Sequence, residues 1–305
     1  MKKIIPACAT FVLASVFAST AVLAHDADGS LAFLGPKGTY SEQAANYWAE
    51  RADGDVNVIE RDNLSDVVEA VEKNNVDQAI LPVMATVSAF PVESHEAILS
   101  NEEPQFSVVG EVSLPIVSQL AVKPGTKKDD IKKILSHPNA LKEASVFLKE
   151  EYLDVPLEDS ASTAAAAKIV AEGDGSSAAV VGPAGAELYE LEVLTDGIQD
   201  DQNNATMFWV LAPKDAEFTK QANRAAVLVD APGGSSAFSD TVSVLQQEGF
   251  NVVFTNSLSL MGKPYAFRYV ISAASEQEAD SADLADKLDS VDGVTVLGLY
   301  AASDK

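Results

Sequence analysis

The chain has 305 residues, 47% hydrophobic and 22% charged, a length that is typical of two domains. This composition excludes collagen-like, coiled-coil and intrinsically disordered proteins, and it is sufficient for well-packed cores. The 46 acidic residues against 21 basic ones give a formal net charge of −25, which repels phosphate backbones and anionic bilayers. We therefore expect no nucleic-acid partner.

The first 24 residues have the layout of a secretory signal peptide. Lys2 and Lys3 precede an apolar run over about 4–21, and Val22-Leu23-Ala24 places small residues at the −3 and −1 positions of a cleavage site before His25. An uncleaved membrane anchor is the alternative, because the run approaches the length of a membrane span. We expect cleavage, export to the periplasm and no stable membrane association of the mature protein. The only cysteine, Cys8, leaves with this segment.

From residue 30 to about 213, predicted strands and helices alternate, which indicates an α/β fold. A short apolar strand over 31–35 leads into the turn GPKGT, and Thr39 with Glu42 has the spacing of a helix capping box. Such strand-to-helix turns place helix N-termini along one edge of a sheet, where unpaired N–H groups favour anions. The further predicted elements are a helix at 41–52, a helical face of Leu64, Val67, Val68 and Val71, a strand at 79–82, a helix at 139–151, a strand near Val155, a helix after Ser162-Thr163, and strands at 178–182 and 207–211.

A polar segment from Lys214 to Asn223 reads as a linker to a second domain over 224–303. The order predicted there is strand, helix, strand, strand, helix, strand, which is the βαββαβ pattern of a ferredoxin-like domain. The predicted bounds are 224–230, about 236–249, 251–258, about 265–273, about 281–290 and 294–300.

Six segments occur in the order and spacing of one enzyme family. They are AFLGPKGTYSEQAA (32–45), SHPNALKEASVFL (136–148), STAAAAKIVAEG (162–173), AAVVGPAGAELYELEVL (178–194), the Asn204-x-Thr206-x-Phe208 set, and VLGLY (296–300). Together they resemble the prephenate dehydratases over about 31–300. The resemblance implies a catalytic part of two α/β subdomains with a cleft between them, as in type II periplasmic binding proteins, over 30–213. A ferredoxin-like ACT regulatory domain follows it.

The resemblance also implies a reaction. Prephenate loses its ring carboxylate as CO₂ and its C4 hydroxyl as water, and the product is phenylpyruvate, the precursor of phenylalanine. This carbon–oxygen lyase chemistry requires no metal and no organic cofactor. The implied partners are a small-molecule carboxylate substrate and a second copy of the chain, bound through the ACT-like domain as a homodimer.

The same resemblance assigns site residues. Thr206 is the catalytic residue, whose hydroxyl hydrogen-bonds the departing oxygen. From the residues alone, Thr206 is also consistent with an ordinary strand position, and Lys37 with a solvated lysine. Thr39 is a good helix cap whether or not a ligand binds. The positions implied to line the substrate cleft are Lys37, Thr39, Ser41, Thr86, Ser162, Thr163, Asn204 and Phe208.

Three positions depart from the family pattern. The family's Thr-Arg-Phe reads Thr206-Met207-Phe208 here, and its Pro-x-Glu-Asn-Ser/Thr reads Pro82-Val83-Met84-Ala85-Thr86. The missing arginine clamps a substrate carboxylate through hydrogen bonds of about 1.5–3 kcal/mol each. Its loss predicts a rate lower by about 10²–10⁴-fold unless another cation substitutes. The alternative function is therefore an exported, non-catalytic binding or sensory protein on the same scaffold.

The second domain departs from the family as well. The family's phenylalanine-binding motifs, Gly-Ala-Leu and Glu-Ser-Arg-Pro, fall on Ser236-Ala237-Phe238 and Leu258-Ser259-Leu260-Met261. Only Ala237 and Ser259 match. We therefore expect no inhibition by phenylalanine at this place, and a domain that serves dimerisation or binds a more apolar molecule.

Two histidines of the mature chain have open roles. His137, in Ser-His-Pro, is suited to fixing a turn or to contacting a ligand. We expect His95 to be an exposed helix residue.

Overall fold

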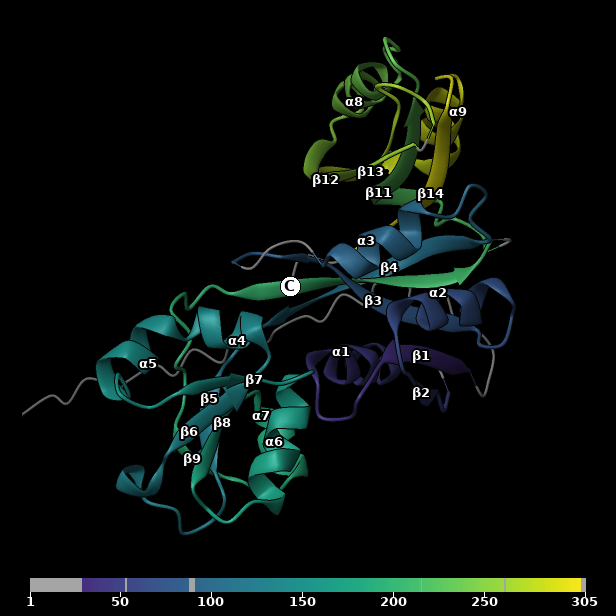
Figure 1. The fold of residues 1–305 in the computed structure, drawn as a ribbon. Coiled ribbons are helices and arrows are strands. Elements are labelled where there is room, and N and C mark those ends of the chain that lie inside the picture. The colour runs from purple at the N-terminus through teal and green to yellow at the C-terminus, as the bar shows by residue number, and fades with distance from the viewer. Residues whose placement is uncertain (1–28, 53, 88–90, 215, 261, 303–305) are drawn as a thin grey trace, which may run out of the picture.

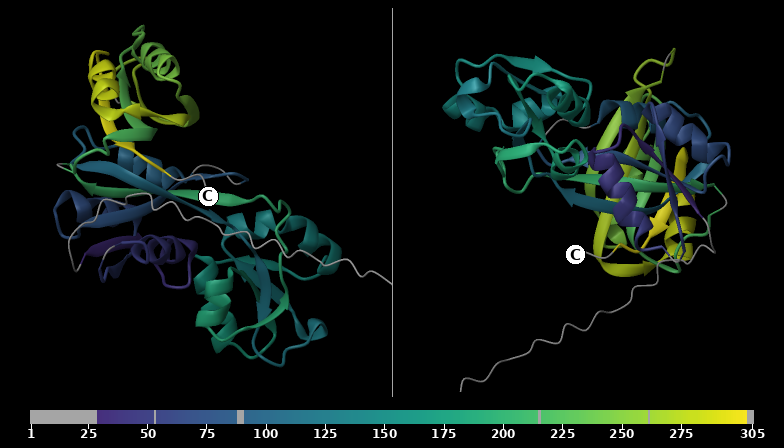
Figure 2. Two further views of the ribbon diagram at one scale, coloured as in Figure 1. Left: turned by 180° about the vertical axis from the view of Figure 1, so that it is seen from behind. Right: turned by 90° about the horizontal axis from the view of Figure 1, so that it is seen from below.

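The computed structural model describes residues 29–302 except 53, 88–90, 215 and 261 (Figures 1 and 2). The predicted signal peptide, its cleavage site before His25 and Cys8 lie outside the described residues. Within them the chain forms three sheets with flanking helices, so the predicted α/β class is confirmed. No helix in this part of the chain is long and apolar enough to cross a bilayer.

The first subdomain is built on a sheet with the strand order β2-β1-β3-β10-β4, called sheet A. Strand β1 pairs in parallel with β2 and β3, whereas β10 lies antiparallel between β3 and β4. Helix α1 packs on one face of the sheet, and α2 and α3 pack on the other. The bounds are β1 (Ser30–Leu34), α1 (Tyr40–Ala49), β2 (Asn57–Arg61), α2 (Leu64–Glu72), β3 (Gln78–Ala85), α3 (Val92–Leu99), β4 (Phe106–Pro115) and β10 (Ala205–Pro213).

The second subdomain repeats this plan in a sheet with the order β7-β6-β8-β5-β9, called sheet B. Its β6 pairs in parallel with β7 and β8, and β5 is the antiparallel strand next to β8. The chain passes between the two sheets twice, from β4 to β5 and from β9 to β10, so the predicted two-subdomain arrangement is confirmed. The bounds are β5 (Gln119–Val122), η1 (Lys128–Asp130), β6 (Lys133–Ser136), α4 (Pro138–Glu143), α5 (Ser145–Glu151), β7 (Leu157–Asp159), α6 (Thr163–Glu172), β8 (Ser177–Val181), α7 (Pro183–Leu188) and β9 (Glu192–Thr195).

One helix predicted over 139–151 is in fact two, α4 and α5, with a break at Ala144. The carboxylate of Asp200 accepts hydrogen bonds from the Ser145 hydroxyl at 2.9 Å and the Val146 N–H at 3.0 Å. It therefore caps a new helix start. Because this cap comes from a residue more than fifty positions away in the chain, the local pattern did not indicate it.

The C-terminal domain confirms the βαββαβ prediction, with an antiparallel sheet of order β12-β13-β11-β14, called sheet C. Strand β11 begins at Gln221, inside the segment predicted as a linker. The Asn223 side chain donates to Ala302 O at 2.9 Å and accepts from Ala302 N at 2.8 Å, so its amide pairs like a backbone group. The bounds are β11 (Gln221–Ala231), α8 (Ala237–Gln247), β12 (Asn251–Ser259), β13 (Phe267–Asp280), α9 (Ser281–Asp289) and β14 (Val294–Tyr300).

Sheet C has helices α8 and α9 on one face and sheet A on the other (Figure 1). Phe254 of β12 contacts Trp209 of β10, with ring centroids 5.5 Å apart. Strand β14 crosses β4 so closely that a Cβ at Gly298 would lie 2.0 Å from the Val108 carbonyl oxygen. The C-terminal domain therefore shares one hydrophobic core with the first subdomain, while the second subdomain extends from sheet A in another direction (Figure 2).

Buried charges fix how sheet C lies on sheet A. The guanidinium of Arg224 donates to Glu111 Oε1 at 2.8 Å, and the Tyr300 hydroxyl donates to Glu111 Oε2 at 2.9 Å. Burial, with Glu111 beside it, raises the pKa of Tyr300 well above its ordinary value. Arg268 binds both carboxylate oxygens of Asp230, at 2.6 and 2.7 Å, and donates to carbonyl groups that end α3.

We predict that Glu111→Gln destabilises the protein by about 1.5–3 kcal/mol, because it removes the charge from the carboxylate that the Arg224 guanidinium and the Tyr300 hydroxyl share. The measurement is urea unfolding of the mature chain. As a matched control, Glu158→Gln removes one partner of the exposed pair with Lys133 and should cost less than about 1 kcal/mol. Equal losses in the two variants would contradict the role assigned to Glu111.

Candidate functional site

The turn after β1 meets the second subdomain at the N-termini of its helices. Gly38 has a φ of 82°, which favours glycine, and a Cβ there would lie 3.2 Å from Gly185 Cα and 3.6 Å from Ala164 Cβ. The N-terminal ends of α1 and α6 therefore converge where the subdomains touch. Their unpaired N–H groups and helix dipoles favour a negatively charged group at this place.

Tyr40 holds the two subdomains together at the same place. Its hydroxyl donates to Val117 O at 2.5 Å and accepts from Val117 N at 2.9 Å, and Val117 lies in the first crossing between the sheets. The ring lies against Gly182, where an added Cβ would be 3.0 Å from it. Burial raises the pKa of Tyr40 to about 12, so its hydroxyl keeps its proton and both hydrogen bonds.

Predicted residues of the first turn occupy the start of α1. Thr39 caps the helix, accepting from Glu42 N at 3.4 Å, as predicted. The Glu42 carboxylate accepts from Gly38 N at 2.6 Å, so the reciprocal bond lies one residue earlier than in a standard capping box. Ser41 is buried, and Lys37 is exposed at the turn.

The second predicted cap is also present. Ser162 accepts a hydrogen bond from Ala165 N at 3.0 Å, and Thr163 is the first residue of α6. Both side chains are half-buried. Because Ala164 lies against Gly38, Ser162 and Thr163 belong to the same junction as Thr39.

Thr86 and Asn204 are joined where β3 ends and β10 begins. Thr86 Oγ1 accepts from Ala205 N at 2.9 Å and lies 3.4 Å from Asn204 Oδ1. Asn204 Nδ2 donates to Glu143 Oε2 at 2.9 Å, and Asn204 O accepts from Ile116 N at 2.8 Å. Ile116 precedes Val117, the partner of Tyr40. These bonds connect Thr86 and Asn204 to the start of α1; we call the whole region, residues 36–41, 86, 162–165, 182–185 and 204–206, the subdomain junction.

Thr206 and Met207 lie on β10, which is hydrogen-bonded between β3 and β4. Thr206 is half-buried and is opposite Ala85 on β3 and Leu114 on β4. Met207 is directly opposite Met84, and both side chains pack against the core that includes α2 and α3. The positions of the family's missing arginine and glutamate are therefore cross-strand neighbours, and two thioethers fill them together.

Three other predicted residues lie away from the junction surface. Phe208 is buried and packs in the core with Phe33 and Val112, so it supports β10 from within instead of lining a cleft. Ala237 is buried at the start of α8, and Ser259 is exposed at the end of β12. 

The two histidines differ from each other. His137 Nδ1 accepts from Asn139 N at 3.2 Å and caps α4, which matches the turn-fixing role. The prediction that His95 is exposed was wrong: it is 2% exposed, because sheet C covers α3. The residues that sequence reasoning missed are Tyr40, Glu143 and His95. Tyr40 stands inside the quoted turn motif, whereas the other two depend on contacts distant in the sequence.

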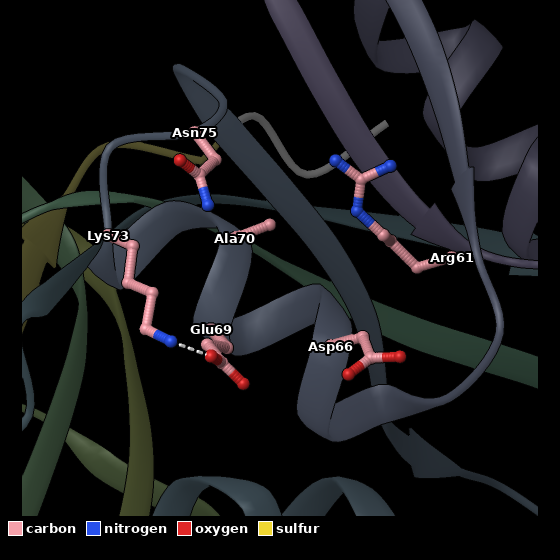
Figure 3. A pocket seen from close by; sticks show the side chains of 6 residues that line it. All are labelled: Arg61, Asp66, Glu69, Ala70, Lys73 and Asn75. Atoms are coloured by element: carbon pink, nitrogen blue, oxygen red, sulfur yellow. Dashed lines mark hydrogen bonds and ion pairs between the residues drawn. The ribbon is translucent and has the colours of Figure 1, made fainter.

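Two cavities lie on the α2–α3 side of sheet A. The larger, about 980 Å³, is lined by the end of β1, by α2 and α3, and by His137 of the second subdomain. Five carboxylates and one lysine line it, which makes it unfavourable for a dicarboxylate. The smaller, about 230 Å³, is shown in Figure 3, where Lys73 pairs with Glu69 beside Arg61 and Asp66. Apart from His137, for which a ligand contact was one of two predicted roles, none of the predicted site residues lines either cavity.

A family model for prephenate dehydratase matches residues 31–216, so the chain belongs to the prephenate dehydratase family. It is 30% identical over 258 residues to a bifunctional chorismate mutase/prephenate dehydratase of Enterobacter agglomerans, which covers 84% of this chain and 66% of that one. It is 33% identical over 189 residues to arogenate dehydratase 1 of Petunia hybrida, covering 62% and 43%. The chain thus spans less than two thirds of the length of these curated relatives.

Solved structures share the fold. Prephenate dehydratase from Arthrobacter aurescens, in complex with L-Phe, aligns with a TM-score of 0.77 at 26% identity, over 90% of this chain and 91% of that one. The quorum quenching acylase GqqA aligns with a TM-score of 0.75 at 23% identity, over 90% and 98%. At that identity the second likeness concerns the fold alone.

We predict that Tyr40→Phe destabilises the protein by about 1–3 kcal/mol, because both backbone groups of Val117 lose their partner. The measurement is again urea unfolding. Tyr47→Phe, on the same helix, is the control; its side chain is 38% exposed and its loss of a hydroxyl should change stability by less than about 0.5 kcal/mol. A Tyr40→Phe variant as stable as the control would mean that Tyr40 does not join the subdomains.

Proposed function

We propose that the mature protein is a prephenate dehydratase, a carbon–oxygen lyase that converts prephenate to phenylpyruvate for phenylalanine biosynthesis. The observation that carries the proposal is the family match over 31–216, which includes the segments that meet at the subdomain junction. The convergence of the α1 and α6 N-termini supports it, because prephenate is a dianion and needs positive potential.

In this reaction the bond from the ring to its carboxylate breaks, and CO₂ departs. The electron pair of that bond enters the ring, the C4–oxygen bond breaks, and the oxygen leaves as water after taking up a proton. Formation of the aromatic ring drives both cleavages. The proposed role of Thr206 is to donate a hydrogen bond to the departing oxygen, while Lys37 and the N-termini of α1 and α6 hold the carboxylates.

The alternative is a non-catalytic binding or sensory protein on this scaffold, and the Met84–Met207 pair favours it. Both methionines are half-buried and pack against the core that includes α2 and α3, so apolar packing fills positions where the family has charges, which suits a scaffold kept for binding. The chain's four arginines are also placed elsewhere: Arg224 and Arg268 bind carboxylates at sheet C, Arg61 lines the smaller cavity, and Arg51 lies over Tyr47.

Export to the periplasm after removal of residues 1–24, and a homodimer through the ACT-like C-terminal domain, complete the proposal. Strand β12 supports the dimer. It is an edge strand of sheet C, it has no charged residue, and Val252 and Val253 are exposed on it. Such an edge offers unpaired backbone groups to another strand. Pairing between copies through β12 would be edge to edge.

We predict that the mature protein, residues 25–305, produces phenylpyruvate from prephenate, and that Thr206→Ala lowers the rate at least tenfold. The measurement is phenylpyruvate absorbance at neutral pH. Thr206→Ser retains the hydroxyl and should retain most of the rate. An unchanged rate in Thr206→Ala would remove this residue from the mechanism.

The same assay separates the two functions. If the wild type forms no phenylpyruvate and the Met84→Glu/Met207→Arg double variant does, the protein is a dehydratase scaffold that has lost catalysis. If both are silent, the binding-protein function is favoured. A wild type with ordinary turnover would exclude that alternative, and would mean that Lys37 and the helix N-termini suffice to hold the substrate.

A further inference from the structure

A buried histidine joins the C-terminal sheet to the strand that enters the subdomain junction. His95 lies on α3, and its Nε2 is 2.8 Å from Val83 O on β3. Its Nδ1 faces the side-chain amide of Asn256 on β12, and its ring stacks on Phe254 with centroids 5.7 Å apart and planes 13° from parallel. One side chain therefore contacts both domains with its polar atoms and its flat face.

The hydrogen-bond partners define which nitrogen carries the proton. A carbonyl oxygen only accepts, so Nε2 carries a hydrogen and donates it to Val83 O. Asn256 Oδ1 accepts from Ser257 N at 2.8 Å, which leaves the Asn256 NH₂ group to donate to Nδ1. Both nitrogens are thus satisfied in the neutral ring. A second proton, on Nδ1, would place an N–H donor opposite the NH₂ donor of Asn256.

The surroundings offer little to stabilise a charged ring. Strands β3, β10 and β12 contain no charged residue, and burial lowers the pKa of His95 below its ordinary value, although the bond to Val83 O opposes this shift. On β13, the Arg268 guanidinium is bound by Asp230. The acidic residues of β13 follow Ala274, which is the last residue of β13 that pairs with β12. The acidic residues on the two helices are Glu93 and Glu96 of α3, both exposed, and Asp66, Glu69 and Glu72 of α2.

We propose that His95 is a pH-sensitive link between sheet C and β3, which depends on the protonation state of its ring. The neutral ring holds β12 against the end of β3, and protonation releases that contact. Protonation breaks the contact at Nδ1 with Asn256, whereas Nε2 keeps its bond to Val83 O, which the charged ring strengthens. The link between the domains does not rest on the proposed function.

The direction of the pH effect follows from the lowered pKa. The unfolded chain takes up the proton near the ordinary histidine value, about 6.5, and the folded chain takes it up only at lower pH. The stabilisation from the neutral ring is complete above that ordinary value and is lost as the pH falls toward the folded value.

The test uses ¹⁹F NMR of the mature protein labelled with 5-fluorotryptophan. The chain has two tryptophans: Trp209 contacts Phe254 at the link, and Trp48 packs on the other face of sheet A, where it serves as the internal control. We expect the Trp209 signal to shift between pH 7.5 and 4.5 with a midpoint below about 6.5, while Trp48 does not shift. Turnover of prephenate plays no part in this measurement.

Two variants make the test specific. In His95→Gln the amide nitrogen can replace Nε2 as donor to Val83 O but takes up no proton, so the Trp209 transition should disappear. In His137→Gln, which changes a half-buried helix cap on the second subdomain, the transition should remain. The same transition in His95→Gln would overturn the proposal, since the response would then belong to other groups.

A second measurement uses the wild-type protein alone. Ring NMR of the wild type, with labelled histidine, follows the titration of His95 directly among three histidines. We expect its midpoint to coincide with that of the Trp209 shift. A His95 ring that stays neutral until the whole protein unfolds, or that titrates while Trp209 remains unchanged, would overturn the proposal.

Discussion

The return of β10 into sheet A, antiparallel between β3 and β4, is the constraint on which the rest of the structure depends. All of sheet B is inserted in the chain between β4 and β10. The hydrogen bonds of β10 to β3 and β4 therefore complete sheet A when the chain returns from the second subdomain. The same strand sets Thr206 opposite Ala85, sets Met207 opposite Met84, and brings Trp209 to the C-terminal domain. The candidate site, the altered family positions and the contact between domains are therefore consequences of one strand register.

The charge distribution explains why family and activity are separate questions here. The features that this chain shares with its family are the turn with Gly38, the helix caps Thr39 and Ser162, and the order of the strands. The chemistry of a dianion needs cations, and in this strongly acidic chain the arginines serve the sheet C interface and the surface. In the proposed function the helix N-termini and Lys37 hold the carboxylates of the substrate, and they are a weaker clamp than a bidentate guanidinium.

Features that depend on neighbours in sequence were predictable, and features that depend on distant neighbours were not. The caps at Thr39 and Ser162, the apolar face of α2 and the βαββαβ order all follow from local spacing, and the structure has them. The break between α4 and α5 depends on Asp200, the early start of β11 on Ala302, and the burial of His95 on sheet C. For the site, the turn and strand segments lie together, whereas the Phe208 ring packs in the core with Phe33 of β1 and Val112 of β4, which are distant in the sequence.

Hydrogen–deuterium exchange of the mature protein with and without prephenate tests whether the substrate binds at the subdomain junction. We expect slower exchange on addition of prephenate at the subdomain junction, in peptides covering residues 36–41, 162–165, 182–185 and 203–207. We expect unchanged exchange over 62–73, where α2 lines the acidic cavities. Protection confined to 62–73, with none at the junction, would contradict binding at the junction.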